Sequence, residues 1–211
     1  MIQGRRALAL LKTLDSIEVE QLCDALAERG VAMEYYATGA EALVRLKELV
    51  PLGTEVQTGS STTLDQIGFT AWLTELHREG KLRYFRAETQ QNADGAARGE
   101  NRRQATLAEY FLGSVNALTV AGEAVCADAA GTRIGGYVYG ARNVIWVVGV
   151  NKIVPTLEDA FRRVWDVALP GEDARIKSIG GHGSEVGKMV VFHRERPDRI
   201  RMLLVGEQLG F

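Results

Sequence analysis

Cysteine and histidine are scarce in this chain of 211 residues, which has two of the first and three of the second. Cys23 and Cys126 lie far apart and at no spacing typical of metal ligands, so we interpret both as reduced thiols in or near the core. The histidines do not cluster with acidic residues at metal-ligand spacing either. The sequence therefore predicts no metal site.

The sequence also lacks an excess of basic charge and a long apolar run. Lys and Arg number 25 against 27 Asp and Glu, giving a net charge of −2, whereas nucleic acids and anionic membranes attract basic proteins. No run approaches the about 18 apolar residues of a membrane span, and the N-terminal segment has no small-residue cleavage site. We expect a cytoplasmic protein that binds neither nucleic acid nor membrane.

What the sequence does contain is an alternation of helix-like and strand-like segments. Residues 18–30 and 41–50 have the spacing of amphipathic helices, and residues 31–37 between them alternate like a strand. The run NVIWVVGV at 143–150 is apolar throughout, as is typical of a central parallel strand buried on both faces. This alternation predicts an α/β fold around a mostly parallel sheet, formed by residues 1–211 as a single domain.

Four further strands are predicted in two pairs. Residues 116–120 and 123–127 flank a short turn, and residues 188–195 and 199–207 are joined by the sequence RPD. Both pairs have the β-branched and aromatic composition of strands. We expect all four to belong to the α/β fold.

The segment QTGSSTTLDQIG at 57–68 places four consecutive hydroxyl residues where a strand gives way to a helix. Loops at the carboxyl ends of parallel strands bind ligands, and backbone N–H groups at a helix start favour an anion. The alternative is that Thr62 or Thr63 only caps the helix, with Asp65 or Gln66 completing a capping box. The residues predicted to bind an anion are Gly59, Ser60, Ser61, Thr62 and Thr63.

A second glycine-rich helix entry follows at residues 131–136. Gly131, Thr132 and Arg133 could meet the same ligand from the other side, or form a tight turn with an exposed arginine. We expect this turn, with Asn116 and Glu123, to lie across one cleft from residues 59–63. Arg133→Ala should then weaken anion binding about tenfold with little change in thermal stability.

Two further groups of residues are candidates for the site. Glu123 and Asp128 flank one predicted hairpin and could form an acid–base pair, or could simply be solvated. The segment GGHGSEVGK at 180–188 departs from the phosphate-loop pattern, because Met189 follows the lysine where Ser or Thr is required. It could still be a flexible loop that contributes His182, Ser184 or Lys188 to a cleft.

The segments GSSTTLDQIGF, SVNALT with the following GE, VVGVNKIV and LLVGEQLGF together resemble the lactate-utilisation (LUD) domain family. The resemblance runs from about residue 20 to the end of the chain. It implies a Rossmann-like, three-layer fold with helices on both faces of the sheet, similar to the ribose-5-phosphate isomerase and CoA-transferase superfamily. Within that superfamily, TGSSTT resembles the phosphate-binding turn TGST, which implies an anion at Gly59–Thr63.

Two departures limit what the resemblance implies. Asn116 occupies the position of an aspartate in the isomerases, and an amide cannot act as a general base. Many short LUD proteins also carry a cysteine cluster before their final strands, where this chain has no cysteine. The isomerase mechanism therefore does not transfer, and the cofactor stays unassigned.

The resemblance implies a protein of lactate (2-hydroxy acid) utilisation that binds a small carboxylate or phosphorylated ligand, or that docks to iron–sulfur or flavin partner subunits. The alternative is an enzyme acting on a sugar phosphate or a CoA-linked substrate, with Glu123 or Asp128 as acid–base and Gly59–Thr63 holding the anion. A ligand-sensing module without chemistry is the third option. A homo-oligomer is compatible with each of them.

Overall fold

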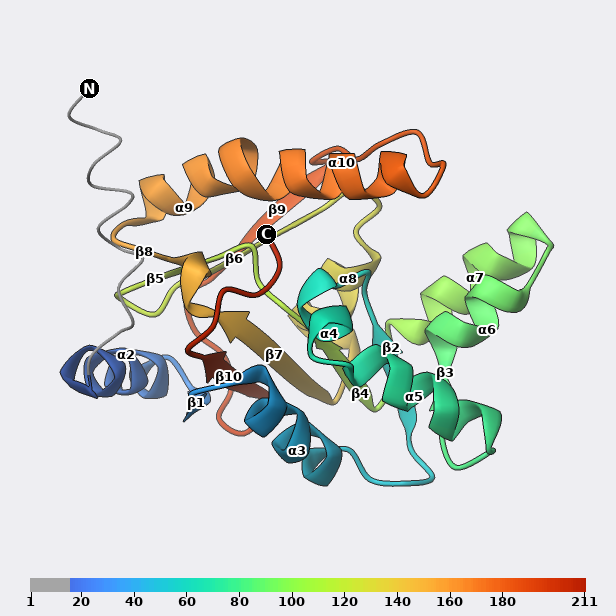
Figure 1. Cartoon of the computed structure of the whole chain (residues 1–211), viewed down its shortest axis with the longest axis horizontal. Helices are drawn as coiled ribbons and strands as arrows, with labels where there is room; N and C mark the ends of the chain where they lie inside the picture. The colour runs from blue at the N-terminus through green and yellow to red at the C-terminus, as the bar shows by residue number, and fades with distance from the viewer. Residues whose placement is uncertain (1–15) are drawn as a thin grey trace.

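A computed structural model describes residues 16–211, which build an α/β fold around a six-stranded sheet (Figure 1). All five neighbouring strand pairs of this sheet are parallel. In spatial order its strands are β1 (Val31–Tyr36), β10 (Ile200–Val205), β7 (Asn143–Gly149), β4 (Tyr110–Gly113), β2 (Glu55–Thr58) and β3 (Arg83–Tyr84).

Strand β7 lies near the middle of the sheet, as its uninterrupted apolar sequence predicts. Its side chains alternate between two buried clusters, with Val144, Trp146 and Val148 on one face. Ile145 and Val147 point to the other. Because neither face meets water, the strand needs no polar alternation.

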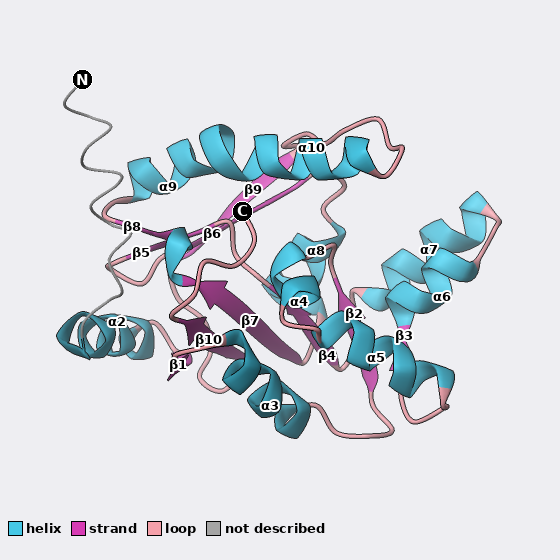
Figure 2. Cartoon of the chain, viewed as in Figure 1, coloured by secondary structure: helices cyan, strands magenta, loops and turns pink. Residues whose placement is uncertain are grey.

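A second, smaller sheet has four strands and was not expected from the sequence (Figure 2). The predicted hairpin is confirmed within it, because its two strands pair antiparallel. The predicted strands at 188–195 and 199–207, however, separate: the first pairs with the hairpin and the second enters the parallel sheet. In spatial order the small sheet contains β8 (Ile153–Val154), β5 (Ala117–Thr119), β6 (Ala124–Asp128) and β9 (Lys188–Phe192).

Helices cover both sides of this two-sheet core, which confirms the predicted Rossmann-like arrangement (Figures 1 and 2). One face of the parallel sheet packs against α3, α4 and α5. The opposite face packs against α2, α8 and the small sheet, and α9 lies on the outside of the small sheet. The helices are α2 (Ser16–Glu28), α3 (Gly39–Leu49), α4 (Thr62–Gln66), α5 (Phe69–Arg78), α6 (Phe85–Gln91), α7 (Gly95–Ala105), α8 (Thr132–Gly135), α9 (Leu157–Arg163) and α10 (Leu169–Ser178).

The mostly aliphatic core between the two sheets contains a row of aromatic side chains. Trp146 makes edge-to-face contacts with Tyr137 and with Phe192 of the small sheet, at ring-centre distances of 5.7 and 5.0 Å. Cys126 is buried in the same cluster, and both it and the half-buried Cys23 are free thiols, as predicted. Among residues 16–211 no helix is long and apolar enough to cross a membrane.

Three neighbouring strands of the parallel sheet end at one edge and deliver the segments that build the site. Strand β2 leads into residues 59–61, β4 leads into residues 114–116, and β7 leads into the 3₁₀ turn Val150–Lys152. The carboxyl ends of parallel strands are where open α/β sheets form their ligand crevices.

Candidate functional site

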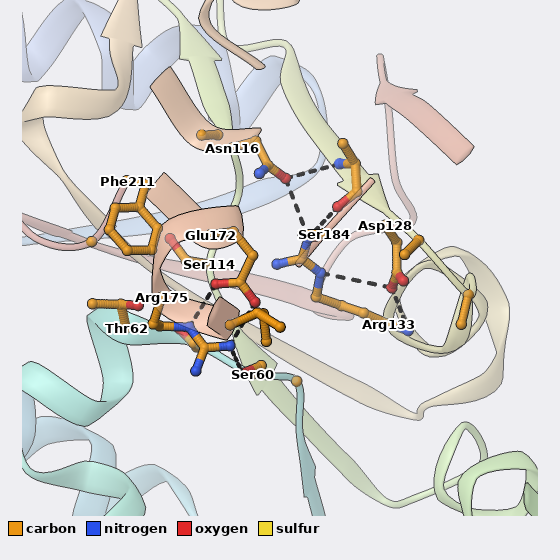
Figure 3. A pocket seen from close by; sticks show the side chains of 18 of the residues that line it. Ser60, Thr62, Ser114, Asn116, Asp128, Arg133, Glu172, Arg175, Ser184 and Phe211 are labelled. Atoms are coloured by element: carbon orange, nitrogen blue, oxygen red, sulfur yellow. Dashed lines mark hydrogen bonds and ion pairs between the residues drawn. The ribbon is translucent and has the colours of Figure 1, made fainter. Parts of the chain in front are cut away.

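A cavity of about 870 Å³ lies at this edge of the sheet (Figure 3). It brings together residues of the strand-to-helix corner, of the small sheet, of the α8 entry and of α10. Most of the predicted site residues line it: Gly59, Ser60, Ser61, Thr62, Thr63, Asn116, Asp128, Thr132 and Arg133. Gly131 and Glu123 do not.

The hydroxyl corner contains one helix cap, and it is not the one predicted. Ser61 is the N-cap of α4, and its Oγ accepts a hydrogen bond of 3.3 Å from the Leu64 backbone N–H. The assignment of the cap to Thr62 or Thr63 is therefore wrong. Because Ser61 reaches this N–H from just outside the helix, the two threonines are left available for other contacts.

The other three hydroxyls have different surroundings. Thr63 Oγ1 lies 3.4 Å from the Leu209 carbonyl, to which it donates. Ser60 Oγ accepts a hydrogen bond of 2.6 Å from Arg175, as Figure 3 shows. The Thr62 Oγ1 atom is buried and has no hydrogen-bond partner among residues 16–211. A buried hydroxyl without a partner is unusual and costs free energy.

Gly59 and Arg133 lie side by side, as the expectation of a shared cleft requires. A Cβ atom on Gly59 would lie 3.1 Å from Arg133 Cδ. The arginine side chain is mostly buried, with 17% of it exposed, so its interpretation as an exposed residue on a tight turn is wrong. Its Nη2 donates to Asn116 Oδ1 at 3.3 Å and to the Ala127 carbonyl (Figure 3). These bonds hold the guanidinium group in place against the small sheet.

The Asp128 carboxylate accepts two hydrogen bonds from backbone N–H groups that follow it in the chain. Its Oδ1 accepts a hydrogen bond from the Gly131 N–H at 3.0 Å, and its Oδ2 accepts one from the Arg133 N–H at 2.9 Å. The carboxylate thus stabilises the turn into α8, and this turn sets the position of Arg133. These two bonds occupy one lone pair on each carboxylate oxygen.

Glu123 lies at the opposite end of strand β6 from Asp128. Its carboxylate accepts a hydrogen bond of 2.9 Å from Thr119 and lies 3.7 Å from Arg29 and 3.6 Å from His193. Five strand positions separate the two acids, a distance of roughly 17 Å, and an odd spacing puts them on opposite faces. The predicted acid–base pair, and the placing of Glu123 in the cleft, are therefore wrong.

Asn116 forms hydrogen bonds with three elements around it, namely β6, α8 and α9. Its Oδ1 accepts hydrogen bonds from the Ala127 N–H at 2.8 Å and from Arg133, and its backbone carbonyl accepts one from Arg163. Arg163 also donates from Nε to the Asn151 carbonyl at 3.2 Å. A single side chain of α9 thus joins two of the segments that form the cavity.

Lys152 is the functional candidate that sequence reasoning missed. Only 3% of this residue is exposed, and its Nζ lies 2.9 Å from Ser114 Oγ and 3.1 Å from Thr63 Oγ1. Within the part of the chain that the structure describes, no carboxylate pairs with it. Burial, and then the charges of Arg163 and Arg133, lower the pKa of Lys152 from 10.5 to about 7.

The signal for Lys152 was present in the sequence. A single lysine follows the longest apolar run of the chain and precedes a second apolar pair, in VVGVNKIV. Lysine is rarely buried without a partner, so a lysine enclosed by apolar residues on both sides is an unusual feature of the sequence. Its hydroxyl partners come from residues 38 and 89 positions away, and only the tertiary fold brings these together.

The loop after α10 closes another part of the cavity wall. His182 and Ser184 line the cavity, as the interpretation of a contributing loop suggested, and the Ser184 N–H donates to Asp173 at 2.9 Å. Lys188 instead packs its side chain over Gly131. Among residues 16–211 no group of three His, Cys, Asp or Glu side chains is placed to hold a metal ion.

Comparisons with known proteins agree with this fold. The chain matches the family model of the LUD domain over residues 19–205. Its structure is similar to the crystal structure of a DUF162 family protein from Deinococcus radiodurans, with a TM-score of 0.55 and 13% sequence identity. The similarity covers 91% of this chain and 99% of that one, and it bears on the fold alone. No curated protein matches the chain.

Proposed function

The chain belongs to the LUD-domain family, and we propose that its cavity binds a small ligand carrying a carboxylate or phosphate group. Membership of the family supports, in general terms, a role associated with lactate utilisation. The proposal adds the binding of an anion and assigns it to the edge where β2, β4 and β7 end.

The observation that carries the proposal is the buried amine of Lys152. A buried cation costs several kcal/mol unless an opposite charge compensates it. Here the neighbours of Nζ are two hydroxyls, and the nearby charges of Arg133 and Arg163 are also positive. An anion bound beside Lys152 would supply the missing compensation.

The surroundings of Lys152 suit a small acid. Thr62 offers a buried hydroxyl with no partner among the described residues. A cavity of about 870 Å³ lies within the size range of small-molecule sites, which is about 300–1,000 Å³. A 2-hydroxy acid or its oxidation product satisfies both the charge of the site and the general role of the family.

The alternative of an isomerase- or transferase-type enzyme receives less support. Of the two carboxylates predicted for its acid–base step, Glu123 lies at the far end of β6 and outside the cavity. Asp128 lines the cavity, but both of its oxygens accept backbone hydrogen bonds that hold the α8 turn. Docking to iron–sulfur or flavin subunits stays an expectation that rests on the family resemblance.

Isothermal titration calorimetry tests the proposal with phosphate, lactate and pyruvate as probes at pH 6 and pH 8.5. We expect at least one of them to bind, and Lys152→Met to weaken that binding about tenfold or more, since a hydrogen bond to a charged group contributes about 1.5–3 kcal/mol. Binding should also weaken as pH rises above about 7, because only the protonated lysine attracts the anion.

The matched control is Lys81→Met, which removes an exposed lysine that pairs with Glu79 and does not line the cavity. It should leave the affinity unchanged. Equal affinity of the wild type and the Lys152→Met variant, or no binding of any of the three probes, would refute the proposal.

A further inference from the structure

Lys152 combines three features of a reactive amine rather than of a simple charged anchor. It is buried, it lines the cavity, and its contacts are hydroxyls instead of a carboxylate. We infer that Lys152 is a nucleophile that condenses with the carbonyl group of a small 2-oxo acid to form an imine. This inference rests on the proposed function, because the same cavity must hold the carboxylate of the acid.

The contacts of Nζ leave the amine able to react. No carboxylate of the described residues pairs with Nζ; the hydroxyls of Ser114 and Thr63 accept hydrogen bonds from it, so the lone pair of the neutral amine stays free. The two hydroxyl protons are donated to the Val115 and Leu209 carbonyls. Both hydroxyls line the cavity beside the lysine. They also hold the long side chain in one position, so that the nitrogen is presented at a fixed point.

The electrostatic surroundings favour the neutral amine. Arg163 of α9 and Arg133 of α8 are the charged groups that lower the pKa of Lys152, in addition to burial, whereas the Cys126 thiol on β6 acts weakly in the opposite direction. With a pKa of about 7, roughly half of the lysine is unprotonated at neutral pH. Desolvation and neighbouring cations are the two means by which proteins activate a lysine for attack on a carbonyl.

The expected step is balanced without an oxidant or a reductant. The Nζ lone pair attacks the carbonyl carbon, an N–C bond forms, and the carbonyl oxygen takes up a proton. The nitrogen gives up one proton, the hydroxyl group takes up a second proton and leaves as water while the nitrogen lone pair forms the C=N bond, and the iminium nitrogen then loses its remaining proton, which restores the proton balance. The hydroxyls of Ser114 and Thr63 lie at 2.9 and 3.1 Å from Nζ, close enough to move a proton between the nitrogen and the oxygen.

The arrangement of the amine and the hydrogen-bond donors favours a 2-oxo acid as the compound that condenses with Lys152. In such an acid the carbonyl carbon is bonded directly to the carboxylate, so the amine and the anion-binding groups must be neighbours. Thr63 contacts Lys152, and the adjacent Thr62 carries the hydroxyl without a partner among the described residues. Oxidation of a 2-hydroxy acid yields this class of compound, which connects the inference with the general role of the family.

Reductive trapping tests the inference directly. The full chain is incubated with pyruvate, or with glyoxylate as a second probe, and treated with sodium cyanoborohydride before intact-mass and peptide-mass analysis. We expect a single adduct with the mass of the oxo acid less one oxygen atom, located on the peptide that contains Lys152. Lys152→Arg, which keeps the charge but has no condensing amine, should lose the adduct, while Lys81→Arg should keep it.

Each outcome decides between the inference and the proposed function. Trapping at Lys152 supports both. Binding of pyruvate by calorimetry without an adduct on Lys152, or adducts spread over exposed lysines instead, overturns the imine and leaves anion binding intact. If the oxo acid is neither bound nor trapped, both the imine and the proposed anion binding are overturned. Should Lys152→Arg fail to fold, peptide mapping of the wild type alone locates the adduct and decides.

Discussion

Replacing Lys152 with methionine should change how the stability of the protein depends on pH. Burial lowers the pKa of this lysine from 10.5 to about 7. Between these values the unfolded chain binds more protons than the folded chain, so unfolding becomes less favourable as pH rises. The penalty of the buried charge is fully present below pH 7 and disappears towards pH 10.5. Methionine has a similar length and no charge, so the variant lacks this dependence.

The magnitude follows from the linkage between protonation and folding. At about 1.36 kcal/mol per pH unit, the wild type should gain about 4 kcal/mol of unfolding free energy relative to Lys152→Met between pH 6 and pH 10. Urea unfolding of both proteins at five pH values gives this difference, and subtracting the two curves cancels the other titrating groups.

An exposed lysine provides the control. The hydrogen bond that Lys81 donates to Glu79 raises the pKa of Lys81, so its contribution to stability is lost as pH rises, which is the opposite sign. Because Lys81 is exposed, the effect of Lys81→Met should be small. A difference between wild type and Lys152→Met that stays constant from pH 6 to pH 10 would show that the lysine is not buried as a poorly compensated cation.

Three further substitutions test single contacts. Arg133→Ala should lower the melting temperature as well as the affinity for an anion, because it leaves the Ala127 carbonyl without its hydrogen-bond donor at a cost of about 1–3 kcal/mol. An unchanged melting temperature would support the original expectation from the sequence. Ser61→Ala should destabilise the protein by about 1 kcal/mol in urea unfolding through loss of the α4 cap, and a neutral result would contradict that assignment. Gly113→Ala should cost about 1–3 kcal/mol in the same assay, because its Cβ would overlap the Tyr137 hydroxyl; a stable variant would mean that the ring can shift freely.

The parallel sheet could be predicted from the sequence because one of its inner strands is buried on both faces. Burial on both faces produces a continuous apolar run, which is easy to recognise. The run at 143–150 has no polar position, and β7 indeed lies inside the sheet. The small sheet was not predicted because the segments KMVVF of β9 and IRMLLV of β10 have nearly the same composition. In the fold, however, β9 is half-exposed and β10 is buried. Composition indicates that each is a strand, whereas its sheet depends on partners distant in sequence.

The site residues also fall into those that local sequence marks and those that only the tertiary fold brings together. The corner at residues 59–63 and the turn carrying Arg133 were found because local chemistry, glycine and hydroxyls at helix starts, marks them. Glu123 was misplaced because residues at the two ends of an extended strand lie far apart, and Glu123 and Asp128 stand at opposite ends of β6. Lys152 was missed because its two hydroxyl partners are joined to it only by the fold.

The position of Arg163 has a consequence for how the molecule can move. Its guanidinium group ties the Asn116 and Asn151 carbonyls to α9, and Asn151 precedes Lys152 in the chain. Helix α9 continues through a π-helical turn into α10, whose Arg175 reaches Ser60 on the opposite wall (Figures 1 and 3). A tilt of this continuous outer helix would therefore pull on both walls at once, so the width of the cavity and the placement of the amine are mechanically coupled.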